Sequence, residues 1–161
     1  MKPTPLPVIG IGPVCVAGVL ASTAGVLWLD WLGHLPVWRI DWLNLPVKIA
    51  AALLLIFAPI LWYGGVIRAK LTENIQNNRL ITTGVYAWVR NPVYTAFLFL
   101  AWAFLIWPGN LFLLLLMPVH LVWMRCILRR TEEKWLTERY QEEYIQYCRK
   151  VNRCIPWFPK K

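Results

Sequence analysis

The chain has few acidic residues, few histidines and no paired cysteine motif. It contains 8 Asp and Glu, 2 His and 4 Cys among 161 residues. Cys15, Cys126, Cys148 and Cys154 include no Cys-x-x-Cys pair, and no histidine stands at a metal-ligand spacing from them. This pattern indicates neither a zinc site nor a disulfide framework. We therefore expect free thiols and no bound metal.

Motifs of several enzyme classes are also missing, since the sequence has no nucleotide phosphate loop and no Ser-His-Asp set. The formal net charge is +9, which in a soluble protein would suggest a nucleic-acid partner. Here the basic residues flank apolar segments, and no soluble basic module is left over. We expect attraction to anionic lipid headgroups and no nucleic-acid partner.

Charged residues are absent from the 34 positions between Arg90 and Arg125. Hydrophobic residues make up 58% of the chain, which includes 11 Trp, whereas soluble domains have roughly 45–50% apolar residues. The length allows about four spans of ~20 residues, polar connections and a tail. The sequence therefore predicts an all-α integral membrane protein that forms a single domain over residues 1–161.

Four apolar segments are predicted to span the membrane, at about residues 8–29, 47–67, 92–107 and 111–128. Pro59 is expected to kink the second segment. The third and fourth segments are short, and the turn at 107–110 joins them in a tight hairpin. His120 in the fourth segment is expected to hydrogen-bond between helices, with a catalytic role as the alternative.

Residues 129–151 are predicted to form an amphipathic helix on the cytoplasmic surface. An apolar and aromatic stripe recurs there at helical spacing: Leu136, Tyr140, Tyr144, Tyr147 and Val151. We expect this stripe to pack against the bundle or the headgroups.

The distribution of basic residues predicts the orientation in the membrane. Of the 17 Lys and Arg, 15 lie at Lys2, between Arg68 and Arg90, or from Arg125 onward. With four spans, these positions share one side, so both termini are predicted to face the cytoplasm. A bacterial inner membrane is the expected location.

Polar side chains stand at both ends of the charge-free stretch. Arg90, Asn91 and Tyr94 precede or open it, and Glu132 and Glu133 follow it. A helical hairpin returns the chain to its starting point, so these residues are expected to form one pocket. Adjacent glutamates point about 100° apart on a helix, so one can face the pocket while the other pairs with a residue such as Arg129. Spacing alone favours a solvated run of charges.

Residues 80–94 (LITTGVYAWVRNPVY) and the later Glu132-Glu133, Tyr140, Glu142-Glu143-Tyr144 and Ile155-Pro156 resemble the isoprenylcysteine carboxyl methyltransferase family. They are similar, more distantly, to the phosphatidylethanolamine N-methyltransferases. The resemblance covers about residues 79–156. It implies a membrane methyltransferase that uses S-adenosylmethionine without a Rossmann domain, with the cofactor entering from the cytoplasm and a lipophilic acceptor from the bilayer.

The resemblance also implies site residues. The positions that match the family's cofactor-binding motif are Leu80, Ile81, Tyr86, Asn91, Pro92, Val93, Tyr94 and Glu132, with Glu133 in support. Arg90, Asn91 and Arg129 are the catalytic candidates.

Two positions depart from the carboxyl methyltransferase pattern. Asn91 stands where that family has histidine. The asparagine at this position is closer to the pattern of the ethanolamine methyltransferases. Leu128 stands where it has an arginine beside the acceptor carboxylate, and Arg125 or Arg129 could replace that arginine. The expected acceptor group is a carboxylate or a thiol, with a phospholipid amine as the runner-up. A four-span transporter or scaffold is the alternative from another class, although the first span lacks the embedded carboxylate typical of a proton-coupled exporter.

Overall fold

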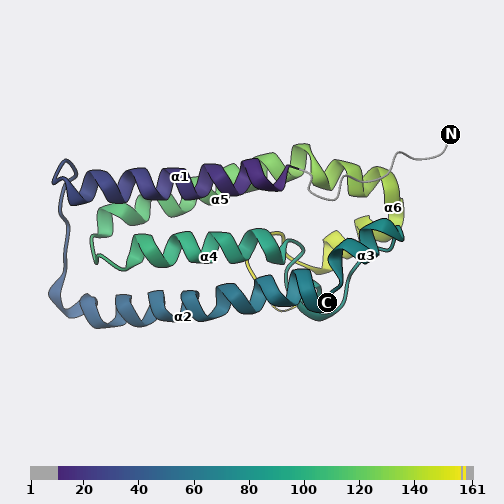
Figure 1. Ribbon diagram of the computed structural model, residues 1–161, viewed down its shortest axis with the longest axis horizontal. Helices are drawn as coiled ribbons and strands as arrows, with labels where there is room; N and C mark the ends of the chain where they lie inside the picture. The colour runs from purple at the N-terminus through teal and green to yellow at the C-terminus, as the bar shows by residue number, and fades with distance from the viewer. Residues whose placement is uncertain (1–10, 157, 159–161) are drawn as a thin grey trace.

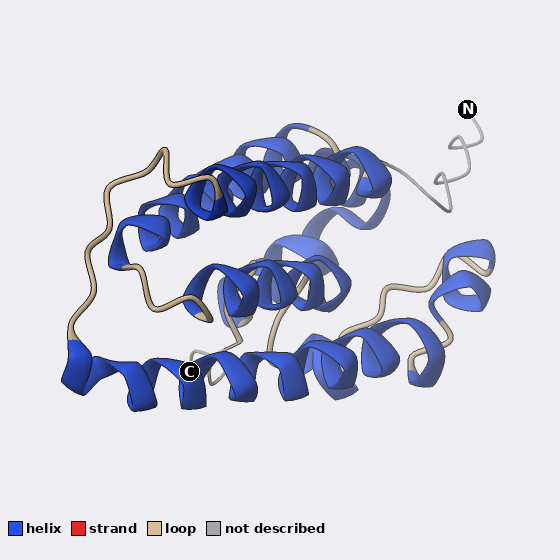
Figure 2. Cartoon of the chain, turned by 60° about the vertical axis from the view of Figure 1, so that its left-hand side comes forward, coloured by secondary structure: helices blue, strands red, loops and turns tan. Residues whose placement is uncertain are grey.

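The computed structural model of the chain describes residues 11–156 and residue 158. Its α-helices are α1 (Gly12–Trp31), α2 (Asn44–Tyr63), α3 (Leu71–Gln76), α4 (Pro92–Ile106), α5 (Leu116–Arg130) and α6 (Glu132–Lys150). Shorter helical turns are η1 (Asp41–Leu43), η2 (Gly64–Arg68), η3 (Gly84–Ala87) and η4 (Leu111–Leu115). The part of the chain that the structure describes contains no β-strand (Figure 2). The predicted all-α class is confirmed.

Four helices form an elongated bundle, and two more gather at one of its ends (Figure 1). The chain runs along the bundle in alternating directions through α1, α2, α4 and α5. The starts of α1 and α4 and the ends of α2 and α5 therefore share the end at which α3 and α6 lie. Segments far apart in the sequence meet there, as the predicted hairpin requires.

Helix α4 lies among the other three bundle helices (Figure 1). Its 15 residues extend only about 22 Å at 1.5 Å per residue, less than the ~30 Å hydrocarbon core. The stretches Gly12–Trp31, Asp41–Arg68 and Leu111–Arg130 are long and apolar enough to cross a membrane. Of the four predicted spans, three therefore have spanning length, and the third is a shorter, more buried helix.

Buried polar residues tie the bundle together at two places. Nε2 of His120 lies 2.9 Å from the hydroxyl of Ser22, which joins α5 to α1, so the expected interhelical hydrogen bond of His120 is confirmed. At the opposite end from α6, the buried Asn110 accepts from the backbone N–H of Trp38 and donates to Asp30. Hydrogen-bonded polar groups of this kind are tolerated in an apolar core, although Nδ1 of His120 has no partner among the described residues.

Helix α2 contains Pro59, where the sequence predicts a kink, in its interior. The helix continues to Tyr63 and then widens into the π-helical η2, in which the N–H of Ala69 bonds to the carbonyl of Gly64. The two glycines of η2 let it approach the polar motif closely. A Cβ on Gly65 would lie 2.9 Å from Cγ of Pro92, closer than a side chain tolerates.

The prediction of one continuous helix over residues 129–151 is wrong. Arg129 belongs to α5, the chain turns at Thr131, and α6 breaks again at Gln141, whose φ is +46°. The aromatic residues on both sides of that break, Tyr140 and Tyr144, line the same cavity. A straight helix of this length would carry the later residues away from it.

Candidate active site

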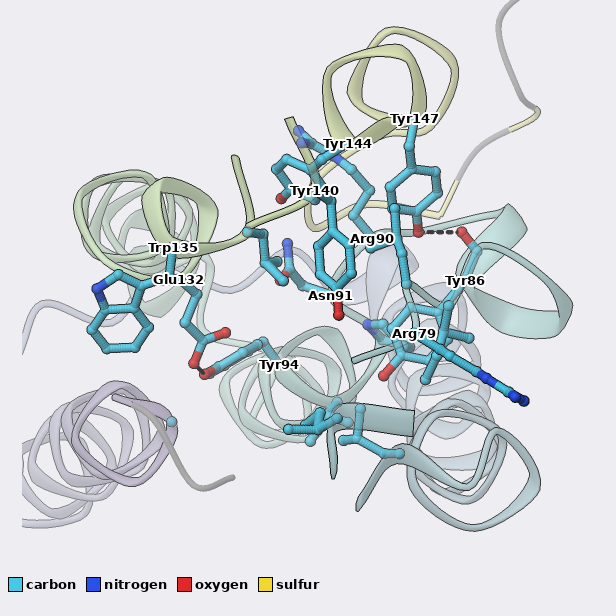
Figure 3. Close-up of a pocket in the computed structure, with 18 of the residues that line it drawn as sticks. Arg79, Tyr86, Arg90, Asn91, Tyr94, Glu132, Trp135, Tyr140, Tyr144 and Tyr147 are labelled. Carbon is cyan, nitrogen blue, oxygen red and sulfur yellow. Dashed lines mark hydrogen bonds between the residues drawn. The ribbon is translucent and has the colours of Figure 1, made fainter. Parts of the chain in front are cut away.

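A cavity of about 440 Å³ lies at the end of the bundle where α3 and α6 gather (Figure 3). Its volume falls in the range typical of small-molecule sites. The sequence-predicted residues that line it are Leu80, Ile81, Tyr86, Arg90, Asn91, Pro92, Val93, Tyr94 and Glu132. Two segments separated by the hydrophobic hairpin thus meet in one pocket. Glu133 and Arg129 are the two predicted residues that do not line it.

Several lining residues were missed in the sequence. They are Gly12, Pro13 and Val16 of α1, Leu71, Ile75 and Arg79 in and after α3, Phe97 of α4, and Trp135, Leu136, Tyr140, Tyr144 and Tyr147 of α6. Apart from Trp135, the α6 residues belong to the helical stripe that the sequence predicts as a packing surface. The first turn of α1 carries no recognisable motif, and its role follows only from the fold.

Glu132 supplies the carboxylate of the pocket wall. It lies in the first turn of α6 and accepts a hydrogen bond from the hydroxyl of Tyr94. Burial raises the pKa of Glu132 above its usual range, although the bonds from Tyr94 and from the backbone of Ile11 oppose this effect. Burial disfavours the charged form of a carboxyl group. A bound cation would restore the stability of the ionised Glu132.

Glu133 points away from the pocket into an ionic cluster. Nε and Nη2 of Arg153 donate to its two carboxylate oxygens at 2.6 and 2.7 Å. Nη1 of Arg90 lies 3.2 Å from Oε1 of the same group. The predicted pairing of Glu133 with Arg129 is therefore wrong, because the turn at Thr131 separates their helices and Arg129 is exposed. The prediction that only one of the two adjacent glutamates faces the pocket is confirmed.

A chain of tyrosines fixes one wall of the pocket. The hydroxyl of Tyr147 donates to the carbonyl of Tyr86 at 2.6 Å (Figure 3). The hydroxyl of Tyr86 donates to the carbonyl of Gly65 at 3.2 Å. Burial, followed by the nearby Glu132, raises the pKa of Tyr86, so its phenol stays a donor. The π-helical turn η2 thus supplies an acceptor to the site, a use typical of such turns.

The segment after α6 crosses the start of α4. The N–H of Arg90 donates to the carbonyl of Asn152 at 2.8 Å, and Nδ2 of Asn91 donates to the carbonyl of Arg153 at 3.0 Å. The hydroxyl of Thr95 donates to the carbonyl of Cys154 at 2.8 Å. These bonds fix the backbone and side chains around Arg90 and Asn91. The segment 152–154 therefore positions the part of the site that comes from the start of α4.

Leu128 lies in the hydrophobic core, fully buried, with Cys15, Val19 and Met124 among its cluster. It does not line the pocket, and neither do the exposed Arg125 and Arg129. Neither arginine is therefore positioned to replace the one that the carboxyl methyltransferase pattern has at this place. The basic side chains of the pocket wall are Arg79 and Arg90.

The side chains that line the pocket suit an organic ligand that carries both a positive and a negative group. It combines one carboxylate, two guanidinium groups, aromatic rings and apolar side chains. Within the described residues, no group of three or more His, Cys, Asp or Glu is arranged to hold a metal ion.

Comparison with known proteins agrees with the geometry. A family model described as phospholipid methyltransferase matches residues 47–143. The chain is 37% identical over 93 residues to the protein-S-isoprenylcysteine O-methyltransferase of Saccharomyces cerevisiae (strain ATCC 204508 / S288c). The aligned region covers 53% of this chain and 36% of that relative. The chain thus spans about a third of that relative's length. No solved structure matches. The family match covers more than half of the chain and includes the motif at Arg90 and both glutamates, so the protein belongs to the phospholipid methyltransferase family.

Proposed function

We propose that this protein transfers a methyl group from S-adenosylmethionine to a lipophilic acceptor at the membrane surface. The observation that carries the proposal is the pocket itself, which joins the half-buried Glu132 to Arg90 and several aromatic rings at one end of an apolar bundle. Membership of a methyltransferase family favours this function over a transporter or scaffold.

The pocket residues fit the proposed methyl donor. S-adenosylmethionine carries an ammonium group, a carboxylate, a sulfonium and a ribose. Glu132 can accept from the ammonium group or from ribose hydroxyls, and the rings of Tyr86 and Tyr94 can lie near a cation. Nε of Arg90 is buried and has no hydrogen-bond partner within the described chain. A donor left unsatisfied in a pocket wall is a group that a ligand oxygen can satisfy.

The sulfonium of the donor supplies an electrophilic methyl group. The acceptor atom forms a bond to that carbon while the carbon–sulfur bond breaks, and its electron pair stays on sulfur. The protein need not form a covalent intermediate. Its residues orient the two ligands, an effect that can contribute up to ~7–11 kcal/mol.

We propose a carboxylate or a thiol as the acceptor group, carried on an apolar body. The apolar side chains of Val16 in α1 and Phe97 in α4 line the pocket. An apolar surface of this kind suits an acceptor that arrives from lipid. A phospholipid amine is the second candidate, favoured by the family description and by Asn91 in place of histidine. We further propose that the pocket end faces the cytoplasm, because most Lys and Arg lie there.

Radiolabelled methyl transfer from S-adenosylmethionine tests the proposal on the purified protein in detergent. The acceptors are a long-chain alkanethiol, an S-prenylcysteine analogue and phosphatidylethanolamine. We expect label in the thiol or the carboxylate acceptor, and its loss in Glu132→Gln. Glu138→Gln is the matched control, because Glu138 is an exposed residue of the same helix. Label in phosphatidylethanolamine alone supports the second candidate. If label enters neither these acceptors nor a native lipid extract, the proposal is contradicted.

A further inference from the structure

The carboxylate of Glu133 lies between two guanidinium groups. Arg153 holds both of its oxygens, at 2.6 and 2.7 Å, and Arg90 approaches one of them at 3.2 Å. The side chains of Arg90 and Glu133 are only 8% and 10% exposed, so solvent screens them little. Two positive charges share one negative charge, and the buried cluster is therefore left with a net charge of +1.

The surplus charge of this cluster lies on the side of the pocket. Arg90 lines the pocket, whereas Glu133 and Arg153 do not. Arg153 binds Glu133 through two bonds, and Arg90 binds it through one longer contact. Glu133 is thus largely satisfied by Arg153, and Nε of Arg90 stays without an acceptor in the described chain.

The backbone holds Arg153 in place independently of Glu133. Its carbonyl accepts from Asn91, and the preceding Asn152 forms a parallel bridge with Val89 and accepts from the N–H of Arg90. Arg153 therefore lies beside Arg90 because the chain around it is fixed there. An arginine held rigidly in this way is suited to neutralise Glu133 and so leave the positive charge of Arg90 uncompensated.

We infer that Arg153 and Glu133 are positioning residues that present Arg90 as an uncompensated cation to the carboxylate of bound S-adenosylmethionine. The inference rests on the proposed function, because the methyl donor carries a carboxylate whichever acceptor is used. Glu132, joined to Tyr94 elsewhere on the wall (Figure 3), is left for the ammonium group of the same ligand. The two ends of the amino-acid moiety then meet groups of opposite charge.

Removing Arg153 alone tests the charge of the cluster. In Arg153→Gln, Glu133 pairs with Arg90 only, and the net charge falls from +1 to zero. In the double variant Glu133→Gln, Arg153→Gln, the net charge returns to +1. We expect calorimetric titration with S-adenosylmethionine to show at least tenfold weaker binding in the single variant and at least threefold recovery in the double variant. Arg149→Gln, at an exposed position near the end of α6, is the control and should bind within twofold of the native protein.

A second ligand identifies the group that Arg90 meets. Decarboxylated S-adenosylmethionine lacks the carboxylate, so we expect the native protein to bind it at least tenfold more weakly than S-adenosylmethionine. The Arg153→Gln variant should lose most of that preference. Arg153→Lys keeps the charge and should stay within about threefold of native affinity.

Three results would overturn the inference. One is a folded double variant that binds no better than Arg153→Gln, since a purely structural role predicts additive damage. Another is equal affinity of the native protein for the two ligands, a result that holds even if Arg153→Gln does not fold. The third is a folded Arg153→Gln variant with native affinity. If the native protein binds no S-adenosylmethionine, the proposed function itself fails.

Discussion

Gly65→Ala tests the close packing of η2 against the start of α4. The new Cβ would lie 2.9 Å from Cγ of Pro92 and 3.3 Å from Cγ2 of Val93. Ordinary contacts begin at 3.4 Å, so Pro92 would have to move by about 0.5 Å to restore one. Its ring cannot rotate away, because proline fixes its own backbone angle. The displacement must therefore pass into α4 and into the neighbouring Asn91.

The expected cost of this change can be set against a control in another helix. Overpacking of this kind destabilises by ~1–3 kcal/mol, and replacing a helical glycine by alanine returns ~0.5–1 kcal/mol. Gly65→Ala should therefore destabilise the fold by about 1–2 kcal/mol. Gly25 has no atom within 4 Å of its hypothetical Cβ, so Gly25→Ala should be neutral or stabilise by up to ~1 kcal/mol.

Thermal unfolding in detergent, followed by a thiol-reactive dye, measures the difference. Cys15 and Cys154 are buried and react when the bundle opens, while the exposed Cys126 gives a constant background. We expect a lower melting temperature for Gly65→Ala than for Gly25→Ala, and weaker binding of S-adenosylmethionine in Gly65→Ala because Asn91 and Tyr86 are displaced with η2. Equal melting temperatures would refute the close packing described for η2.

Three further predictions follow from the site and the fold. Leu128→Arg should lose most folded protein and gain no prenylcysteine methylation, because it places an unpaired charge in the core at a cost of several kcal/mol; Leu128→Met is the folded control, and a stable, active Leu128→Arg would contradict the core placement. The affinity for S-adenosylmethionine should rise as pH increases through the raised pKa of Glu132, because only the ionised carboxylate binds a cation. The stability of the ligand-free protein should fall over the same pH range, because an acid whose pKa is raised by burial is more stable in its protonated form. Both trends should vanish in Glu132→Gln. Single cysteines placed at Asp41 and Lys150 in a protein freed of its own thiols report orientation in intact cells: labelling of the first and not the second by an impermeant reagent is expected, and the reverse would overturn the cytoplasmic pocket.

Much of the fold could be predicted because the bilayer constrains the sequence strongly. The uncharged stretch between Arg90 and Arg125 requires a hairpin, and the hairpin requires Asn91 and Glu132 to meet. The bend at Gln141 could not be predicted, since no glycine or proline marks it. It follows from tertiary contacts, because Tyr140 and Tyr144 reach the same cavity only if the helix changes direction there.

The ionic partner of Glu133 was missed for a related reason. Sequence spacing suggests local helical pairs such as Arg129 with Glu133, which assumes that the helix runs on through Thr131. The turn at Thr131 removes this pairing, and Arg153, twenty residues later, takes the place instead. Contacts made by the π-helical turn, such as that of Gly65 with Tyr86, leave no periodic signal in the sequence at all.

Binding of S-adenosylmethionine to the purified protein tests the central claim most directly. Charged hydrogen bonds of the kind expected at Glu132 contribute ~1.5–3 kcal/mol each, which is roughly a 10- to 150-fold change in affinity. Calorimetric titration should therefore show saturable binding to the native protein, a loss of that size in Glu132→Ala, and native affinity in Glu138→Ala, with all three proteins folded. Absence of binding to the native protein, or unchanged affinity in Glu132→Ala, would contradict the account of this pocket as a methyl-donor site.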